Sequence, residues 1–301
     1  MKVIYGSNKI RRFKKPVLAL GVFDGVHRGH IEILKEAVRK ARSIKGTSIV
    51  LTFWPHPQKE QSLYSLEHRL RLISNIGIDA CVVINFNHKF AAMPAPDFVK
   101  DILFNKLAPR YVYAGKNFRF GKNAKGDSRT LSRLSKIYNF RVKIFEVIKI
   151  QGKPISSTYI RALIKKGKLA LAKKLLTRPV SILGTVIKGD SLARKLGFPT
   201  ANINPHHEVI PPHGVYAVRA IVNGGKFNGA CYIGSRPTFP DKKSKNVEVH
   251  IFNFGKHIYE KVLEIQFIKR IRGEKKFNSV PALVEQIRKD LLAARNISSL
   301  H

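Results

Sequence analysis

An apolar run that ends in a glycine-rich turn, and is followed at once by a helical pattern, constrains the fold of this chain most strongly. The run covers residues 17–22, the turn continues to residue 28, and apolar residues then recur at helical spacing through 29–44. This is the pattern of a buried strand, a tight turn and a helix. Ligands of open α/β sheets bind beyond the carboxyl ends of the strands, so the turn is a candidate binding site.

The turn carries residue types that suit a bound phosphate. Gly25 and Gly29 let a bulky anion approach the backbone closely. His27 and His30 lie three residues apart, so both side chains can face one ligand at the start of the helix. Backbone N–H groups and the helix dipole favour an anion there. Taken alone, the two residues could equally be surface histidines at a helix start.

Composition limits the size class and the partners. A chain of 301 residues suggests two domains. It has 56 Lys and Arg against 19 Asp and Glu, a formal net charge of +37, which fits nucleotides, nucleic acid or an anionic membrane as partners. The cations are scattered along the sequence, and we interpret most of them as solvated surface. We find no RRM, zinc-finger or homeodomain signature, so nucleic acid is not a required partner.

The cysteines and the N-terminal segment bear on location. Cys81 and Cys231 both lie in apolar stretches, which predicts buried thiols in a reducing compartment. Residues 1–15 are basic but lack the apolar region of a signal peptide, and no apolar run is long enough to span a bilayer. We therefore expect a cytoplasmic protein that does not bind membranes and is a monomer or a weak homo-oligomer.

The first half of the chain alternates strands with helices. This alternation predicts a doubly wound α/β domain with a parallel sheet, covering residues 1–178. Strands are expected at 17–22, 47–53, 79–86, 111–114 and 140–146. Helices are expected at 29–44, 66–76, 97–107 and 158–165, with a basic helix at 169–179 as the connection to the second half.

Three further stretches of the first half place polar or aromatic groups at a strand end or a helix start. They are His56 after the second strand, Asn117, Phe118, Arg119 and Phe120 after the fourth, and Ser156, Ser157, Thr158 and Arg161 at a helix start. The aromatic loop could stack a planar ring and contact phosphate, or it could be a basic surface loop with one buried ring. The hydroxyls and the arginine could hold phosphate, although hydroxyls at this place are also ordinary helix caps.

Together these stretches resemble the FAD synthetase branch of the nucleotidyltransferase superfamily. The matching motifs are F-D-G-V-H-R-G-H (23–30), T-F-W-P-H-P (52–57), G-K-N-F-R-F-G (115–121) and I-S-S-T-Y-I-R (155–161). The resemblance implies a Rossmann-like domain in which His27, His30 and Arg161 are catalytic and stabilise charge during adenylyl transfer. It implies ATP binding by Gly21, Phe23, Asp24, Gly25, Gly29, Ser156, Ser157 and Thr158, and flavin binding by His56, Asn117, Phe118, Arg119 and Phe120. Asn117 stands where many members carry Asp.

The second half, residues 179–301, changes to short strands and turns. Strands are expected at 181–188, 214–222, 227–233, 247–254 and 262–272, and Ser279 is expected to cap a final helix. Repeated short strands with Pro and Gly turns predict a small antiparallel β-barrel.

Two polar pairs stand out in this half. Thr200 and Asn202 share one face of an extended segment and offer hard oxygen ligands to Mg²⁺, although a plain turn explains the same residues. Glu248 and His250 share the polar face of an alternating strand. A carboxylate there could take the proton of a substrate hydroxyl, while most such faces are simply solvated.

These pieces resemble a riboflavin kinase domain. The matching motifs are G-T-V-I-K-G (184–189), L-G-F-P-T-A-N (196–202), H-G-V-Y-A-V (213–218), I-G-S-R-P-T-F (233–239), E-V-H (248–250) and R-G-E-K-K-F (272–277). The resemblance implies that Thr200 and Asn202 hold Mg²⁺, that these two residues and Gly189 bind ATP, and that Glu248 is catalytic and activates the ribityl hydroxyl. It implies flavin contacts from Arg272, Glu274 and Phe277. Ala193, Tyr232 and Asn253 depart from the residues usual in the family.

The two resemblances imply a bifunctional enzyme that uses ATP, riboflavin and FMN, with Mg²⁺. It would phosphorylate riboflavin to FMN and then join AMP to FMN, giving FAD and pyrophosphate. One alternative is an FMN adenylyltransferase whose kinase half is impaired by its departures. A second alternative is a basic nucleic-acid-binding protein on the same scaffold. A third is a transferase for another phosphorylated substrate, but this reading does not explain the second half of the chain.

Overall fold

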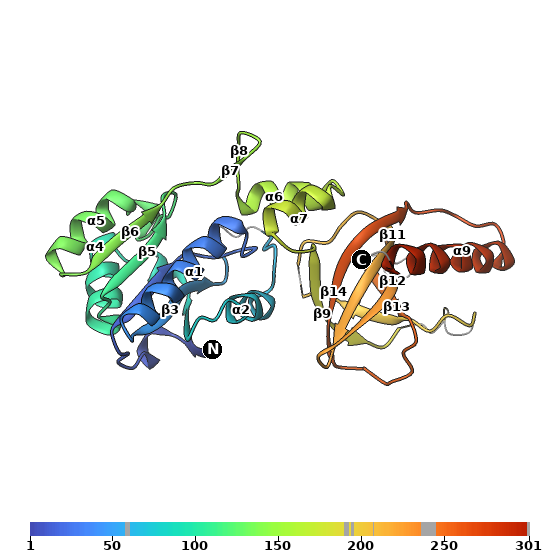
Figure 1. Ribbon diagram of the computed structural model, residues 1–301, viewed down its shortest axis with the longest axis horizontal. Helices are drawn as coiled ribbons and strands as arrows, with labels where there is room; N and C mark the ends of the chain where they lie inside the picture. The colour runs from blue at the N-terminus through green and yellow to red at the C-terminus, as the bar shows by residue number, and fades with distance from the viewer. Residues whose placement is uncertain (58–60, 190–192, 194–195, 207, 236–244, 300–301) are drawn as a thin grey trace. The chain divides into compact units, whose positions relative to one another are not determined.

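The computed structural model describes residues 1–301 except 58–60, 190–192, 194–195, 207, 236–244 and 300–301 (Figure 1). The described residues form two compact units, one of residues 1–62 and 66–157 and the other of residues 63–65 and 158–301. The units divide at the start of helix α6 (Ser157–Lys165). The functional boundary at residue 178, which assigns one activity to residues 1–178 and the other to residues 179–301, stays a prediction.

The first unit contains a six-stranded parallel sheet with strand order β1-β4-β3-β2-β5-β6. Its strands are β1 (Lys2–Tyr5), β2 (Pro16–Leu20), β3 (Thr47–Trp54), β4 (Ala80–Asn85), β5 (Tyr111–Gly115) and β6 (Arg141–Phe145). The predicted parallel α/β fold is confirmed. The edge strand β1 was not predicted, because it is only four residues long and only Ile4 in it is fully buried.

Helices cover both faces of this sheet. They are α1 (Arg28–Ser43), α2 (Leu66–Ser74), α3 (His88–Ala91), α4 (Ala95–Asp97), the π-helix η2 (Phe98–Leu107) and α5 (Ser128–Ile137). Alternate residues of β2 pack into two different cores: Leu18 lies with Phe98 of η2, and Ala19 lies with Leu34 of α1. Because these strands are buried on both faces, their sequences are nearly continuous runs of apolar residues. Helix α5 was not predicted, because its sequence is mostly polar and buries only Leu131, Leu134 and Ser135.

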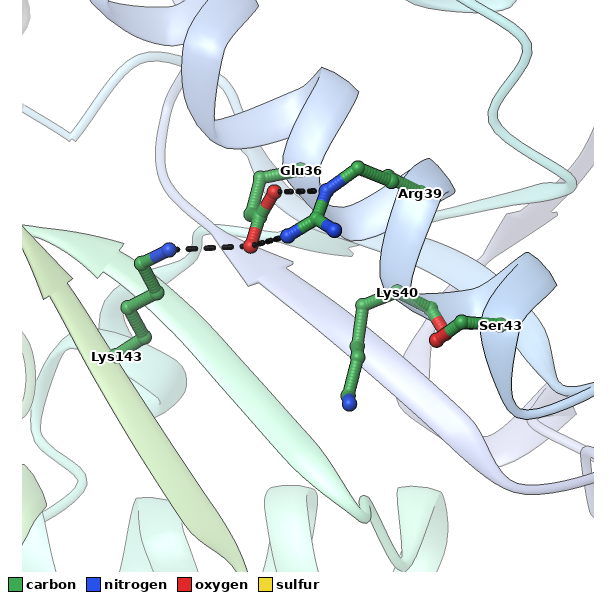
Figure 2. Close-up of polar contacts among 5 residues, drawn as sticks. All are labelled: Glu36, Arg39, Lys40, Ser43 and Lys143. Atoms are coloured by element: carbon green, nitrogen blue, oxygen red, sulfur yellow. Dashed lines mark hydrogen bonds and ion pairs between the residues drawn. The ribbon is translucent and has the colours of Figure 1, made fainter.

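An ion-pair cluster links α1 to the edge strand β6. Figure 2 shows the Glu36 carboxylate between the guanidinium of Arg39, with two contacts of 2.7 Å, and the Lys143 ammonium at 3.0 Å. The hydrogen bond from Arg39, reinforced by Lys143, lowers the pKa of Glu36 from 4.5 to about 2. A carboxyl group whose pKa is depressed by folding contributes stability above its unfolded pKa and loses it as the pH falls toward its folded pKa.

We expect Glu36→Gln to lower the free energy of unfolding at pH 7 by about 1 kcal/mol or less, because Arg39 and Lys143 are exposed and water screens the pairs. The difference from the parent should shrink as the pH falls from about 4.5 to about 2. Urea unfolding of both proteins at pH 7, 4.5 and 3 measures it. A difference that stays constant with pH would show that the charge of Glu36 does not stabilise the fold.

The second unit contains a closed antiparallel barrel with strand order β10-β13-β12-β11-β14-β9. Its strands are β9 (Ser181–Ile187), β10 (Ala201–Asn204), β11 (Gly214–Val222), β12 (Gly225–Ser235), β13 (Lys245–Ile251) and β14 (Val262–Arg272). Helix α7 (Leu169–Leu176) precedes the barrel, and α9 (Val280–Ser299) follows it. The predicted antiparallel barrel with a terminal helix is confirmed.

The barrel strands alternate between two environments. Cys231, Ile233 and Val249 are fully buried and belong to one face. Residues of the opposite face, including Ala230 and Phe252, pack with Ala294 of α9. Helix α9 therefore covers part of the outer surface of the barrel, and the polar residues of that same face lie beside the covered part.

Candidate active sites

The loop after β2 holds an unusual backbone conformation. Phe23 and Val26 have positive φ angles of 53° and 40°, and Gly25 has a φ of 80°. Phe23, Asp24 and Val26 are nevertheless buried. Non-glycine residues adopt this region at a cost in conformational energy, and they keep it where the surrounding structure holds them there.

Hydrogen bonds from three other elements fix this loop. The carbonyl of Val22 accepts from the Thr52 hydroxyl of β3 at 2.9 Å and from the Arg69 guanidinium of α2 at 2.5 Å. The carbonyl of Asp24 accepts from the Ser157 hydroxyl at 2.6 Å. Arg69 is fully buried and also lies over the Trp54 ring at 5.4 Å. The loop is therefore held in place before any ligand binds.

His27 and His30 lie where this loop becomes α1. His27 is the N-cap of the helix, and its Nδ1 accepts from the backbone N–H of His30 at 3.4 Å. The two rings are stacked with their centroids 3.6 Å apart, and the His30 ring meets the edge of Phe23 at 5.2 Å. His27 is 7% exposed, while Gly29 and His30 are partly exposed. The two imidazole rings therefore lie together at the start of α1.

The remaining expected residues of the first half are distributed over several elements. Ser156 precedes α6 and Ser157 begins it, Thr158 is exposed, and Arg161 is 8% exposed one helical turn further along. His56 follows β3, and Asn117 follows β5. Because β3 and β5 flank β2 in a parallel sheet, the segments after all three strands leave the same edge.

The two aromatic rings of the loop after β5 differ in how deeply they are buried. Phe120 is 6% exposed and packs in the core against Phe98 at 5.4 Å between centroids. Phe118 stacks on Phe120 at 5.7 Å and is partly exposed, while Asn117 and Arg119 are exposed. The core ring thus supports the outer ring, which is the more exposed of the two.

In the second unit, strand pairing collects the expected kinase residues. Asn202 of β10 lies opposite Glu248 of β13. One carboxylate oxygen of Glu248 accepts from the Thr200 hydroxyl at 3.3 Å, and the other accepts from the Asn246 amide at 2.5 Å. Gly189 lies so near that a Cβ there would come within 2.0 Å of the Asn202 amide nitrogen. The hydroxyl, the amide and the carboxylate form one polar cluster beside a glycine.

The segment after β14 carries the expected flavin residues. Arg272 makes a bidentate ion pair with the buried Asp290 of α9, with contacts of 2.7 to 3.0 Å. Its guanidinium also lies 5.7 Å from the centre of the Phe277 ring. Glu274 accepts from the Tyr232 hydroxyl at 3.0 Å. Within the described residues, no group of three or more His, Cys, Asp or Glu side chains could hold a metal ion.

Sequence reasoning missed several residues that shape these sites. They are Thr52, Arg69, Asn246 and Asp290, together with the contact that Tyr232 makes. Extending the expected strand 247–254 by one residue toward its start could have indicated Asn246, which lies two residues before Glu248 and so on the same face.

The comparisons with known proteins agree with this geometry. The FAD synthetase family model matches residues 9–159, and the riboflavin kinase family model matches residues 176–298. A relative from Bacillus subtilis is 38% identical over 92% of this chain and 90% of its own length. A relative from Escherichia coli K12 is 34% identical over 100% of this chain and 99% of its own. Both are described as bifunctional riboflavin kinase/FMN adenylyltransferase.

A solved structure shows the same fold along nearly the whole chain. It comes from Streptococcus pneumoniae and is named a macrolide-efflux protein; it is 29% identical, has a TM-score of 0.85 and matches 98% of this chain and 99% of its own. In the part of the chain that the structure describes, no helix has the length and apolar composition needed to cross a membrane.

The two family matches and the two site clusters define a two-domain transferase of flavin cofactor synthesis. The chain belongs to the family of bifunctional riboflavin kinase/FMN adenylyltransferases.

Proposed function

We propose that residues 1–178 transfer AMP from ATP to FMN, giving FAD and pyrophosphate. The observation that carries this assignment is the stacked histidine pair at the start of α1, next to a loop fixed by Thr52, Arg69 and Ser157. Imidazole N–H groups and the helix N-terminus stabilise the negative charge that develops on the phosphates. Arg161, on the helix that Ser157 begins, adds a fixed positive charge that suits a triphosphate.

The flavin of this reaction is assigned to the segments after β3 and β5. Phe118 is the partly exposed ring that stacks on Phe120, and it offers a face to the isoalloxazine. His56 and Asn117 follow the two strands that flank β2. Asn117 contributes hydrogen bonds without the charge of the usual Asp. FMN attacks the α-phosphorus of ATP directly, and no protein nucleophile is needed.

We propose that residues 179–301 transfer the γ-phosphoryl group of ATP to riboflavin. Glu248 takes the proton of the ribityl hydroxyl as that oxygen attacks the phosphorus. Thr200 and Asn246 hold the two carboxylate oxygens of Glu248, so the base has a fixed orientation. Phosphoryl transfer needs little covalent chemistry from the protein, and a positioned base, phosphate contacts and a metal ion account for it.

Mg²⁺ is the metal that the residues of the second unit fit. The hydroxyl of Thr200 and the amide oxygen of Asn202 are hard oxygen ligands, and the Glu248 carboxylate adds negative charge beside them. Gly189 leaves space against Asn202 that a side chain would fill. When bound with ATP, the ion neutralises charge on the transferred phosphate. We further propose a cytoplasmic enzyme, a monomer or a weak homo-oligomer, that requires neither a membrane nor nucleic acid.

Incubation of the purified protein with riboflavin, Mg²⁺ and ATP, followed by chromatography of the flavins, tests both activities. FMN followed by FAD is the expected result. FAD from supplied FMN, but no product from riboflavin, would show that the kinase half is inactive and would leave the adenylyltransferase alone. No product from either flavin would contradict both assignments, and binding to nucleic acid with steep salt dependence would then support the alternative reading.

A further inference from the structure

A row of side chains crosses the outer face of the barrel at the proposed kinase site. In the strand ladder, Tyr232 of β12 lies directly opposite Glu248 of β13, and Glu248 lies opposite Asn202 of β10. Residues directly opposite each other project from the same face of a sheet. Tyr232 is therefore the neighbour of the proposed base on the side away from the proposed metal ligand.

The hydroxyl of Tyr232 is already engaged. It donates to Oε1 of Glu274 at 3.0 Å, and the other carboxylate oxygen of Glu274 lies 3.2 Å from Nδ1 of His213. The backbone carbonyl of His213 in turn accepts from Arg270 at 2.5 Å. Burial and the acceptor Glu274 raise the pKa of Tyr232 to about 12, so the phenol stays protonated and remains a donor at neutral pH.

Gly234 supplies the space for this hydroxyl. A Cβ at Gly234 would come within 2.1 Å of the Tyr232 oxygen and 2.3 Å of the ring carbon that bears it. Gly234 has no positive φ angle, so the absence of a side chain, rather than backbone freedom, matters at this position. The tyrosine ring thus extends along β12 over a glycine and places its oxygen at the segment after β14.

That segment carries Glu274 and Phe277, to which the resemblance to riboflavin kinases assigns flavin contacts. We propose that Tyr232 is a positioning residue of the kinase reaction: by donating to Glu274, it holds the segment 273–279 beside the face that carries Glu248, and so sets the affinity for riboflavin. The proposal rests on the proposed function of the second unit. It also gives the departure at position 232 a role in substrate binding.

The test is steady-state riboflavin phosphorylation by Tyr232→Phe, which removes one oxygen and keeps the ring. We expect the KM for riboflavin to rise about tenfold, the scale of a lost hydrogen bond to a charged group, with kcat changed less than about threefold. Gly234→Ala should raise the KM in the same way, because it displaces the hydroxyl. Tyr259→Phe, an exposed tyrosine of the same unit, is the control and should leave the KM unchanged.

A double-mutant cycle separates positioning from general destabilisation. In a Glu274→Ala background, Tyr232→Phe should add no further rise in the KM, because its acceptor is gone. FAD formation from FMN and the thermal unfolding midpoint should match the parent in each single variant. Equal KM values for Tyr232→Phe and the parent, or fully independent effects of the two substitutions, would overturn the positioning role and leave the kinase assignment intact. If riboflavin fluorescence is not quenched when the parent protein is titrated into the flavin, both the positioning role of Tyr232 and the kinase assignment are overturned.

Discussion

His30→Ala should reduce FAD formation from FMN by about 100- to 1000-fold, the loss seen when one preorganised donor to a developing oxyanion is removed. The His30 ring stacks on His27 and contacts Phe23, so it lies against the fixed loop at the start of α1. Riboflavin phosphorylation by the same preparation should stay at the parental rate, because that reaction is assigned to the other unit. FMN would then accumulate when riboflavin is supplied.

His88→Ala is the matched control, since His88 is an exposed histidine of the same unit, on α3. It should leave both rates unchanged. Thermal unfolding of the His30→Ala protein checks that the loss is not due to misfolding, and the retained kinase activity gives a second check. If His30→Ala forms FAD from FMN at the parental rate, the assignment of the adenylyl site to the start of α1 is wrong.

The local arrangement around His27 and His30 could be predicted from the sequence because its parts are neighbours in the chain. The strand, the turn, the cap and both rings lie within residues 17–30, and local spacing places them. Thr52 and Arg69 escaped prediction because they reach Val22 across 30 and 47 residues. In a chain with 56 Lys and Arg, no sequence pattern separates one fully buried arginine from solvated ones.

The kinase site was predictable only in part for a different reason. Thr200, Asn202 and Glu248 were selected by their residue types and motifs, but their proximity depends on the register between β10 and β13. Register is set by burial of one face and by turns, and a shift of one residue would move Glu248 to the other face. The ladder also decides that Tyr232 lies beside Glu248, which no local spacing shows.

Arg272 illustrates how a residue chosen from a motif can have an unexpected neighbour. The motif R-G-E-K-K-F selected it for the flavin, and the structure places its guanidinium on Asp290 of α9. Asp290 is 5% exposed and lies 18 residues further along the chain. Removing Asp290 would leave a half-buried guanidinium without its partner, which costs more than losing an exposed pair. The terminal helix therefore helps to orient the segment that the family motif defines.

Glu248→Gln should lower the rate of riboflavin phosphorylation by about 100- to 10,000-fold, the range for loss of a positioned general base. The substitution keeps the size of the side chain but removes its ability to take a proton. One oxygen can still accept a hydrogen bond, whereas the new amide nitrogen must face Thr200 or Asn246, both of which donate to the carboxylate in the parent. The loss should fall on kcat, with the KM for riboflavin changed much less.

FAD formation from supplied FMN should be unaffected in this variant, and Glu260→Gln, at an exposed carboxylate of the same unit, should match the parent in both reactions. Initial rates of FMN formation with saturating ATP and Mg²⁺ measure the effect. If the parent phosphorylates riboflavin well above background and Glu248→Gln has the same kcat, this carboxylate is not the base. A parent whose own rate is barely above background would instead indicate that the departures at Ala193, Tyr232 and Asn253 have impaired the kinase.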